Sequence, residues 1–387
     1  YWWSDFDAGE VREEFALTRE IDLEVVRLFL TWEDWQPVPD VVDPGALNHF
    51  EEVCEIASGL GLRLNVTFFT GHMSGPSWTP SWMLHPGQPM PPRIWQVVSG
   101  GRTVDCGYRN PFTDPLVLRA EELQLRTVVS RFRQHPAIEV WNLGNEPDIF
   151  AWPADAAGGK EWTRRMTTLI REIDPNHPVT CGLHVASLLE DNGLRVNDVF
   201  NEVDIPVMHG YPMYADWSNG PLDSDFVPFL CALTTALCGK PSLMEEFGGC
   251  TAAPGQASFV HEWQRYGNPF RQFMASEEDL AAYIEAVLPK LVEVGALGAM
   301  IWCYADYIPA LYDRPPCDQA WHERFFGLVR PDGSLKPHAE VIKRFAASRP
   351  VVQPTRRPVS LDVTPEAYYQ APKRHAVRLY HTFSGGR

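Results

Sequence analysis

The sequence feature that most limits the possible folds of this chain is a regular alternation of short apolar runs with helical segments. Apolar runs typical of strands lie at residues 25–32, 62–69, 138–144, 177–183, 203–211, 240–247 and 297–304. Between and after them lie segments with helical spacing of apolar residues, at 43–62, 114–133, 159–173, 225–238, 276–294 and 336–347. Neighbouring parallel strands need a crossover connection, so this alternation predicts a parallel sheet covered by helices.

Seven such strands fit a (β/α)8 TIM barrel better than a dinucleotide-binding sheet, because no G-x-G-x-x-G follows any run. A helix capped by Asp7 precedes the first run, so we expect the first barrel strand to lie upstream of Tyr1, which implies an N-terminal truncation. We therefore predict a catalytic barrel over residues 1–347. Residues 348–387 form a Pro-rich C-terminal extension, in which "VSLDV" and "VRLYHTF" are candidates for a small β element.

The composition narrows the classes of partner. The net charge is −17 and no Lys/Arg run occurs, so we expect no nucleic acid and no membrane as partner; a neutral carbohydrate substrate is compatible. The eight cysteines form no CxxC pair, which favours free thiols, although Cys231 and Cys238 could bridge in a secreted protein. No cofactor and no metal are expected. Oligomeric state and localisation stay open.

Two carboxylates follow strands that lie 100 residues apart in the sequence. Glu146 follows the run at 138–144, the fourth barrel strand when the missing first one is counted, in "WNLGNEP", and Glu245 and Glu246 end a later run, in "LMEEFGG". In a (β/α)8 barrel the C-terminal ends of all strands line one shared mouth. Paired carboxylates in one cleft are the machinery of glycoside hydrolysis, retaining at a separation of about 5–5.5 Å and inverting at about 6.5–9.5 Å.

These motifs resemble the clan A retaining glycoside hydrolases. "WNLGNEP" resembles their acid/base motif and "LMEEFGG" their nucleophile motif, while "RLFLTW", "HGYP" and "IWCY" resemble other strand-end signatures, closest to family 5 with its mannanases, β-mannosidases and cellulases. The resemblance covers roughly residues 1–347. It implies that Glu146 is the general acid/base and Glu246 the nucleophile, with Glu245 as the alternative nucleophile.

The same resemblance implies roles for the residues around the two carboxylates. Arg27 would pair with the nucleophile, Tyr211 would donate a hydrogen bond to it, and Asn145 would hold the sugar 2-hydroxyl group. The other implied substrate-binding residues are His72, His209, Trp302, Trp78 and Trp82. Each of these has an ordinary structural alternative, such as an ion pair for Arg27 or core packing for Trp302.

The overall resemblance favours β-mannosides as substrates. β-Glucosides or β-galactosides are alternatives within the clan, and a catalytically silent carbohydrate-binding barrel is an alternative of another class. A metal-dependent hydrolase is disfavoured, because no strand end carries a His-x-His pair or a His/Asp ligand set. The long segment 70–113 is expected to close one end of the cleft and to favour exo action.

Overall fold

A computed structural model describes residues 1–88 and 96–385. The chain forms two compact units. The first contains Tyr1–Leu183 and Asn192–Ile205, and the second contains His184–Asp191 and the chain from Pro206 onward.

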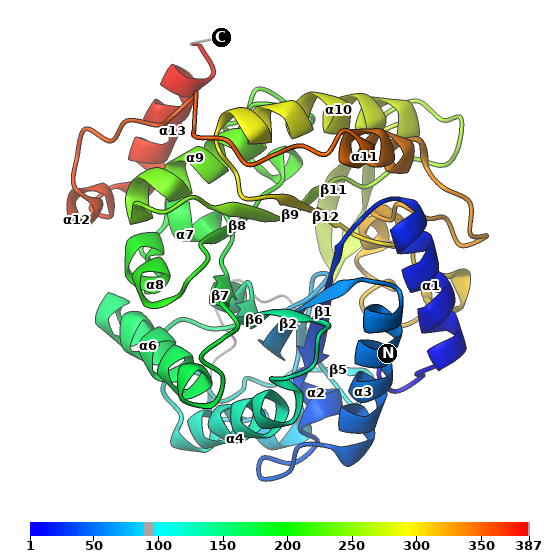
Figure 1. Cartoon of the computed structure of the whole chain (residues 1–387), viewed down its shortest axis with the longest axis vertical. Coiled ribbons are helices and arrows are strands. Elements are labelled where there is room, and N and C mark those ends of the chain that lie inside the picture. Colours follow the sequence, from blue (N-terminus) through cyan, green and yellow to red (C-terminus); the bar gives the residue numbers. More distant parts are fainter. Residues whose placement is uncertain (89–95, 386–387) are drawn as a thin grey trace. The chain divides into compact units, whose positions relative to one another are not determined.

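The first unit is built on a four-stranded parallel sheet (Figure 1). Its strands are β1 (Val25–Thr31), β2 (Arg63–Thr70), β6 (Ile138–Asn145) and β7 (Val179–Gly182), in the order β1-β2-β6-β7. Every neighbouring pair in the sheet is parallel, as the alternation of strands and helices predicts. Among the candidate site residues of this unit, Arg27 lies within β1, Asn145 ends β6 and Glu146 follows it.

Three helices of the first unit begin directly after a capping aspartate, and the sequence predicts the cap Asp7. The helices of this unit are α1 (Ala8–Glu20), α2 (Trp32–Trp35), α3 (Pro44–Gly59), α4 (Pro115–Phe132), α5 (Pro147–Phe150), α6 (Ala156–Ile173) and α8 (Val196–Glu202). The side chains of Asp7, Asp43 and Asp114 accept hydrogen bonds from backbone N–H groups of the first turns of α1, α3 and α4. Large aromatic side chains fill the core of this unit, among them Trp32, Phe50, Phe68 and Trp141.

The long segment after β2 contains elements that the sequence pattern did not predict. β3 (Ser77–Trp78), β4 (Val97–Ser99) and β5 (Arg102–Val104) form a small sheet, and a 3-10 turn, η1 (Ser81–Met83), follows β3. Strands of two or three residues leave almost no period-2 signal. The segment is thus folded structure in its described part.

The second unit contains a three-stranded parallel sheet in the order β12-β9-β8. Its strands are β8 (Val207–His209), β9 (Leu243–Gly248) and β12 (Ala299–Trp302), so all seven predicted strands are present. Its helices include α7 (Ala186–Leu189), α9 (Phe226–Cys238), α10 (Glu277–Glu293) and α11 (Pro337–Ala347), and α10 packs against both α9 and α11 (Figure 1). The hydroxyl of Ser276 accepts from the N–H of Asp279, which confirms the predicted start of α10.

A β-hairpin lies between β9 and α10 and was not predicted. β10 (Phe259–Arg265) pairs antiparallel with β11 (Asn268–Met274). The two residues of its turn, Tyr266 and Gly267, both have positive φ, as the favoured two-residue hairpin turn requires. The alternating sequence on either side of "YG" was the available signal.

The C-terminal extension is helical, so the expectation of a small β element is wrong. "VSLDV" forms no strand, and "VRLYHTF" lies in α13 (Pro372–Phe383), which follows the short helix α12 (Pro365–Tyr368). Ala376, Leu379 and Tyr380 are buried at helical spacing. The boundary predicted at residue 347 stays a prediction.

All eight cysteines, each within the described residues, are free thiols. The Cys231–Cys238 bridge considered above is therefore absent. In the part of the chain that the structure describes, no helix is long and apolar enough to cross a membrane.

Candidate active site

Glu146 directly follows β6 in a backbone conformation that few residues other than glycine adopt. Its φ is 47° and its ψ is 53°, in the left-handed region. Its N–H donates to the carbonyl of Gly182 at 2.8 Å, and Pro147 begins helix α5 directly after it. A left-handed non-glycine residue costs on the order of 1 kcal/mol and is enriched at functional sites. The fold therefore tolerates strain in order to aim this carboxylate.

The surroundings of Glu146 hold three of the other predicted residues. His72 Nε2 lies 3.9 Å from a Glu146 carboxylate oxygen, and both side chains are largely buried. The Asn145 amide nitrogen donates to the His72 carbonyl at 2.9 Å, and the Arg27 guanidinium donates to the Asn145 oxygen at 2.9 Å. Arg27 also donates to the hydroxyl of Thr67 on β2. These two hydrogen bonds hold the Asn145 side chain through both its amide nitrogen and its amide oxygen.

Glu246 on β9 has the hydrogen bond that the sequence predicted. The Tyr211 hydroxyl donates to a Glu246 carboxylate oxygen at 2.7 Å. His209 Nδ1 lies 3.5 Å from the other carboxylate oxygen. Glu246 is 8% exposed, so part of the residue remains open to solvent or substrate. The ion pair expected between Arg27 and Glu246 stays a prediction.

The neighbouring Glu245 has a different environment. Its carboxylate lies 3.0 Å from His209 Nε2, and both of these side chains are completely buried. His209 thus lies between two carboxylates with one ring nitrogen facing each. The imidazole of His209 has no exposed surface, and its expected part in shaping the sugar subsite stays a prediction.

Trp302, the last residue of β12, is half-buried. It packs against a buried cluster of Tyr211, Cys250, Met274 and Phe326. Since Tyr211 belongs to this cluster and bonds Glu246, Trp302 and the Glu246 carboxylate are connected through one tyrosine. An aromatic face at this position suits the C–H face of a sugar ring.

Trp78 and Trp82 are both held by contacts with other parts of the first unit. The Trp78 indole N–H donates to the Met73 carbonyl, and its ring meets that of Tyr1 edge-on at 5.9 Å. The Trp82 indole N–H donates to the Gln36 carbonyl at 2.8 Å. Trp78 is only 9% exposed. Their predicted contact with substrate stays a prediction.

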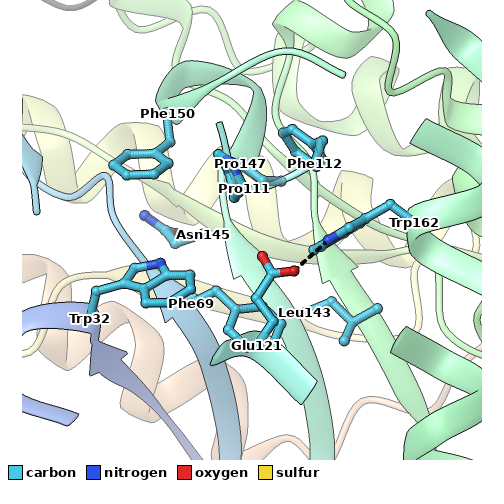
Figure 2. Close-up of a pocket in the computed structure, with 10 residues that line it drawn as sticks. All are labelled: Trp32, Phe69, Pro111, Phe112, Glu121, Leu143, Asn145, Pro147, Phe150 and Trp162. Atoms are coloured by element: carbon cyan, nitrogen blue, oxygen red, sulfur yellow. Dashed lines mark hydrogen bonds between the residues drawn. The ribbon is translucent and has the colours of Figure 1, made fainter. Parts of the chain in front are cut away.

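The sequence analysis missed a buried acid beside this site. Glu121 of α4 is fully buried and lines a small cavity with Trp32, Asn145 and Trp162 (Figure 2). Trp162 Nε1 donates to one carboxyl oxygen at 3.0 Å, and the other oxygen has no partner among the described residues. Burial raises the pKa of Glu121 well above its usual range. Its place between Val117 and Leu125 on the apolar face of the helix was the available signal.

Comparison with known proteins identifies the family. The family described as "Glycosyl hydrolases family 2, TIM barrel domain" matches residues 94–345, more than half of the chain. The chain belongs to this family. Its fold is therefore the TIM barrel of the glycosidases, as the alternation of strands and helices predicted.

Individual relatives agree on the fold and the clan. A probable mannan endo-1,4-beta-mannosidase C from Aspergillus terreus is 26% identical over 57% of this chain and 54% of its own length. The exo-beta-1,4-mannosidase Op5Man5 from Opitutaceae bacterium strain TAV5 is 26% identical, with a TM-score of 0.72 over 90% of this chain and 57% of that chain. A GH5_18 protein from Streptomyces cattleya, solved with GlcNAc, is 20% identical, with a TM-score of 0.78 over 100% of this chain and 88% of that chain.

These matches confirm the resemblance to clan A glycoside hydrolases close to family 5, while the family match names family 2, a different family. The chain spans about a third to a half of the length of the curated relatives that it matches.

Proposed function

We propose that this chain hydrolyses β-mannosides with retention of configuration, with Glu246 as nucleophile and Glu146 as acid/base. The observation that carries the proposal is the environment of Glu246: a strand-end carboxylate, partly open, that accepts the Tyr211 hydroxyl at 2.7 Å. In TIM barrels the catalytic residues come from the C-terminal ends of several strands, and Glu146 and Glu246 both belong to such strand ends. The mannosidases among the relatives support the choice of sugar.

The reaction has two steps. In the first, a Glu246 carboxylate oxygen bonds to the anomeric carbon while the bond to the leaving oxygen breaks, and Glu146 gives that oxygen its proton. In the second, Glu146 takes a proton from water, the water oxygen bonds to the anomeric carbon, and the bond to Glu246 breaks. The Tyr211 hydroxyl orients Glu246 for the first step.

We propose that Glu245 and His209 support the site and do not react with the substrate. Glu245 is fully enclosed against His209, so it has no path to a sugar, whereas Glu246 retains some exposure. His209 contacts both carboxylates and would hold Glu246 in place from behind. We propose that His72 and Asn145 position the acid/base, and that Asn145 also meets the sugar 2-hydroxyl group.

The test is hydrolysis of a panel of aryl β-mannoside, β-glucoside and β-galactoside by the parent, Glu146→Ala, Glu246→Ala and Glu245→Gln. We expect the β-mannoside to be the best substrate. Both alanine variants should lose about 10³-fold or more in kcat/KM on it, and Glu245→Gln should lose less. A parent that binds mannosides without turnover would establish the silent barrel instead, and activity lost to EDTA would establish a metal enzyme.

A further inference from the structure

The β10–β11 hairpin presents an aromatic face that the proposed chemistry does not use. Along β10, Phe259, His261 and Trp263 are half-buried and alternate with exposed residues such as Val260. A two-stranded hairpin is marginally stable alone, so its half-buried face needs a partner. That partner is the segment of η4 (Trp321–Phe325).

The outermost pair on this face is Trp321 with His261. Their ring centroids are 4.0 Å apart at an interplanar angle of 31°. Trp321 also packs against the cluster of Tyr211, Cys250, Met274 and Phe326, the same cluster that supports Trp302. Trp321 and Trp302 therefore pack against one cluster, which includes the tyrosine bonded to Glu246.

The polar atoms of this pair are not used by the protein. Trp263 donates its indole N–H to the Gln319 carbonyl at 2.8 Å, whereas the Trp321 N–H has no acceptor among the described residues. Trp321 and His261 are both half-buried, so their polar atoms retain access to solvent. Burial lowers the pKa of His261, which favours its neutral imidazole. An aromatic face with neutral hydrogen-bonding groups at its edge is the surface that recognises a pyranose ring.

We propose that Trp321 and His261 form a subsite for a second pyranose unit of a β-mannan oligosaccharide, next to the unit over Trp302. The inference rests on the proposed function, because it places the second sugar relative to the Glu246 half of the site. It makes Trp321 a specificity-determining residue for chain length. The Trp321 face turned away from His261 would carry the stacking, and the Trp321 N–H would bond a hydroxyl group of the ring. His261 would hold the Trp321 ring from its other face.

The experiment compares kcat/KM for mannotriose with kcat/KM for β-mannosyl fluoride, whose leaving group fills no further subsite. We expect Trp321→Ala to lower the value for mannotriose by about tenfold or more and to leave that for the fluoride within about twofold. Trp321→Phe keeps an aromatic face without the N–H and should lose less. His261→Ala should act in the same direction as Trp321→Ala.

The control is Val260→Ala, on the exposed face of the same hairpin, which should change neither value. Equal losses on both substrates in Trp321→Ala would mean that the residue only supports the fold, and this overturns the inference. An unchanged ratio of the two values also overturns it. A parent that hydrolyses neither substrate contradicts the proposed function instead, so the two failures are distinguishable.

Discussion

At the scale of single residues, the conformation of Glu146 connects stability with function. A glycine adopts a φ of 47° without the steric cost that a Cβ atom brings. We expect the free energy of unfolding of Glu146→Gly to be about 1 kcal/mol larger than that of Glu146→Ala, so that the glycine variant is the more stable one. Both variants should be inactive. Denaturant unfolding of the two variants measures this difference.

The matched control is Glu161, which is exposed within helix α6. There the order should reverse, with Glu161→Ala more stable than Glu161→Gly by about 1 kcal/mol. If Glu146→Gly proved no more stable than Glu146→Ala, the strain assigned to this residue would be absent.

Glu121 predicts a pH dependence of stability. Its pKa is raised in the folded protein by burial, so the folded state binds a proton more tightly than the unfolded state. The contribution of Glu121 to the free energy of unfolding is therefore fully present below pH 4.5, the pKa of this group in the unfolded chain. It decreases as the pH rises above that value. Glu121→Gln has no titrating proton at this position. We therefore expect the stability of the variant, measured relative to that of the parent, to be greater at pH 8 than at pH 5.5. Unfolding midpoints at the two pH values test this, and a constant difference between parent and variant would contradict it.

The sequence identified the site residues where a strand end and a carboxylate or ring coincide. Glu146 and Tyr211 follow strands and Glu246 lies within β9, and the predicted Tyr211–Glu246 hydrogen bond is present. The burial of His209 behind Glu246 was not predictable, because alternation along β8 does not reveal how deep an imidazole lies. Glu121 was missed because a single glutamate in a helix usually faces solvent, even where its neighbours at helical spacing are apolar.

At the scale of elements, long periodic segments were predictable and short or Pro-rich ones were not. The seven strands and the capped helices carry clear period-2, buried or 3.6-residue patterns. The hairpin β10–β11 was missed because its half-buried face lacks a strong apolar run. Helix α13 was read as a strand because the prolines that precede it suggested irregular chain, although its apolar residues have helical spacing.

The turn "FGLVRPDGSLKP" depends on a buried ion pair. Lys336 Nζ lies 2.7 Å from Asp306 and donates to the Thr251 hydroxyl at 2.8 Å, and Lys336 is 1% exposed. Burial lowers the pKa of Lys336 and raises that of Asp306, while each opposes the shift of the other. Lys336→Met leaves a buried acid without its cation, so we expect a loss of about 3–5 kcal/mol in the free energy of unfolding.

Chemical denaturation measures this loss. Adding Asp306→Asn to Lys336→Met should recover part of it, because the uncompensated charge is then removed. If Lys336→Met alone proved as stable as the parent, the ion pair would not be what holds the turn.

At the scale of the whole molecule, the C-terminal extension is an integral part of the second unit. The Tyr368 hydroxyl donates to the Leu188 carbonyl at 2.7 Å, and the buried ring of Tyr380 meets Phe229 at 5.1 Å. Arg357 pairs with Asp225 at 2.7 Å. These contacts join the extension to α7 and to the start of α9.

We therefore expect Tyr380→Ala to destabilise the protein by about 3–5 kcal/mol, as for other large aromatic side chains removed from a core. Thermal or denaturant unfolding measures the loss. Val351→Ala, in an exposed part of the same extension, is the control and should change the free energy of unfolding by less than about 0.5 kcal/mol. Equal stability of both variants would make the extension an appendage without a structural role.

The central claim is that Glu246 forms a covalent bond to the anomeric carbon while Glu146 serves as acid/base. Incubation with a mannosyl fluoride that carries fluorine in place of the 2-hydroxyl group should trap this intermediate, because the substitution slows its hydrolysis. Mass spectrometry of peptides from the trapped protein should then find one fluoromannosyl group on Glu246. A label on Glu245, or a protein that hydrolyses mannosides with inversion and without any label, would contradict the account.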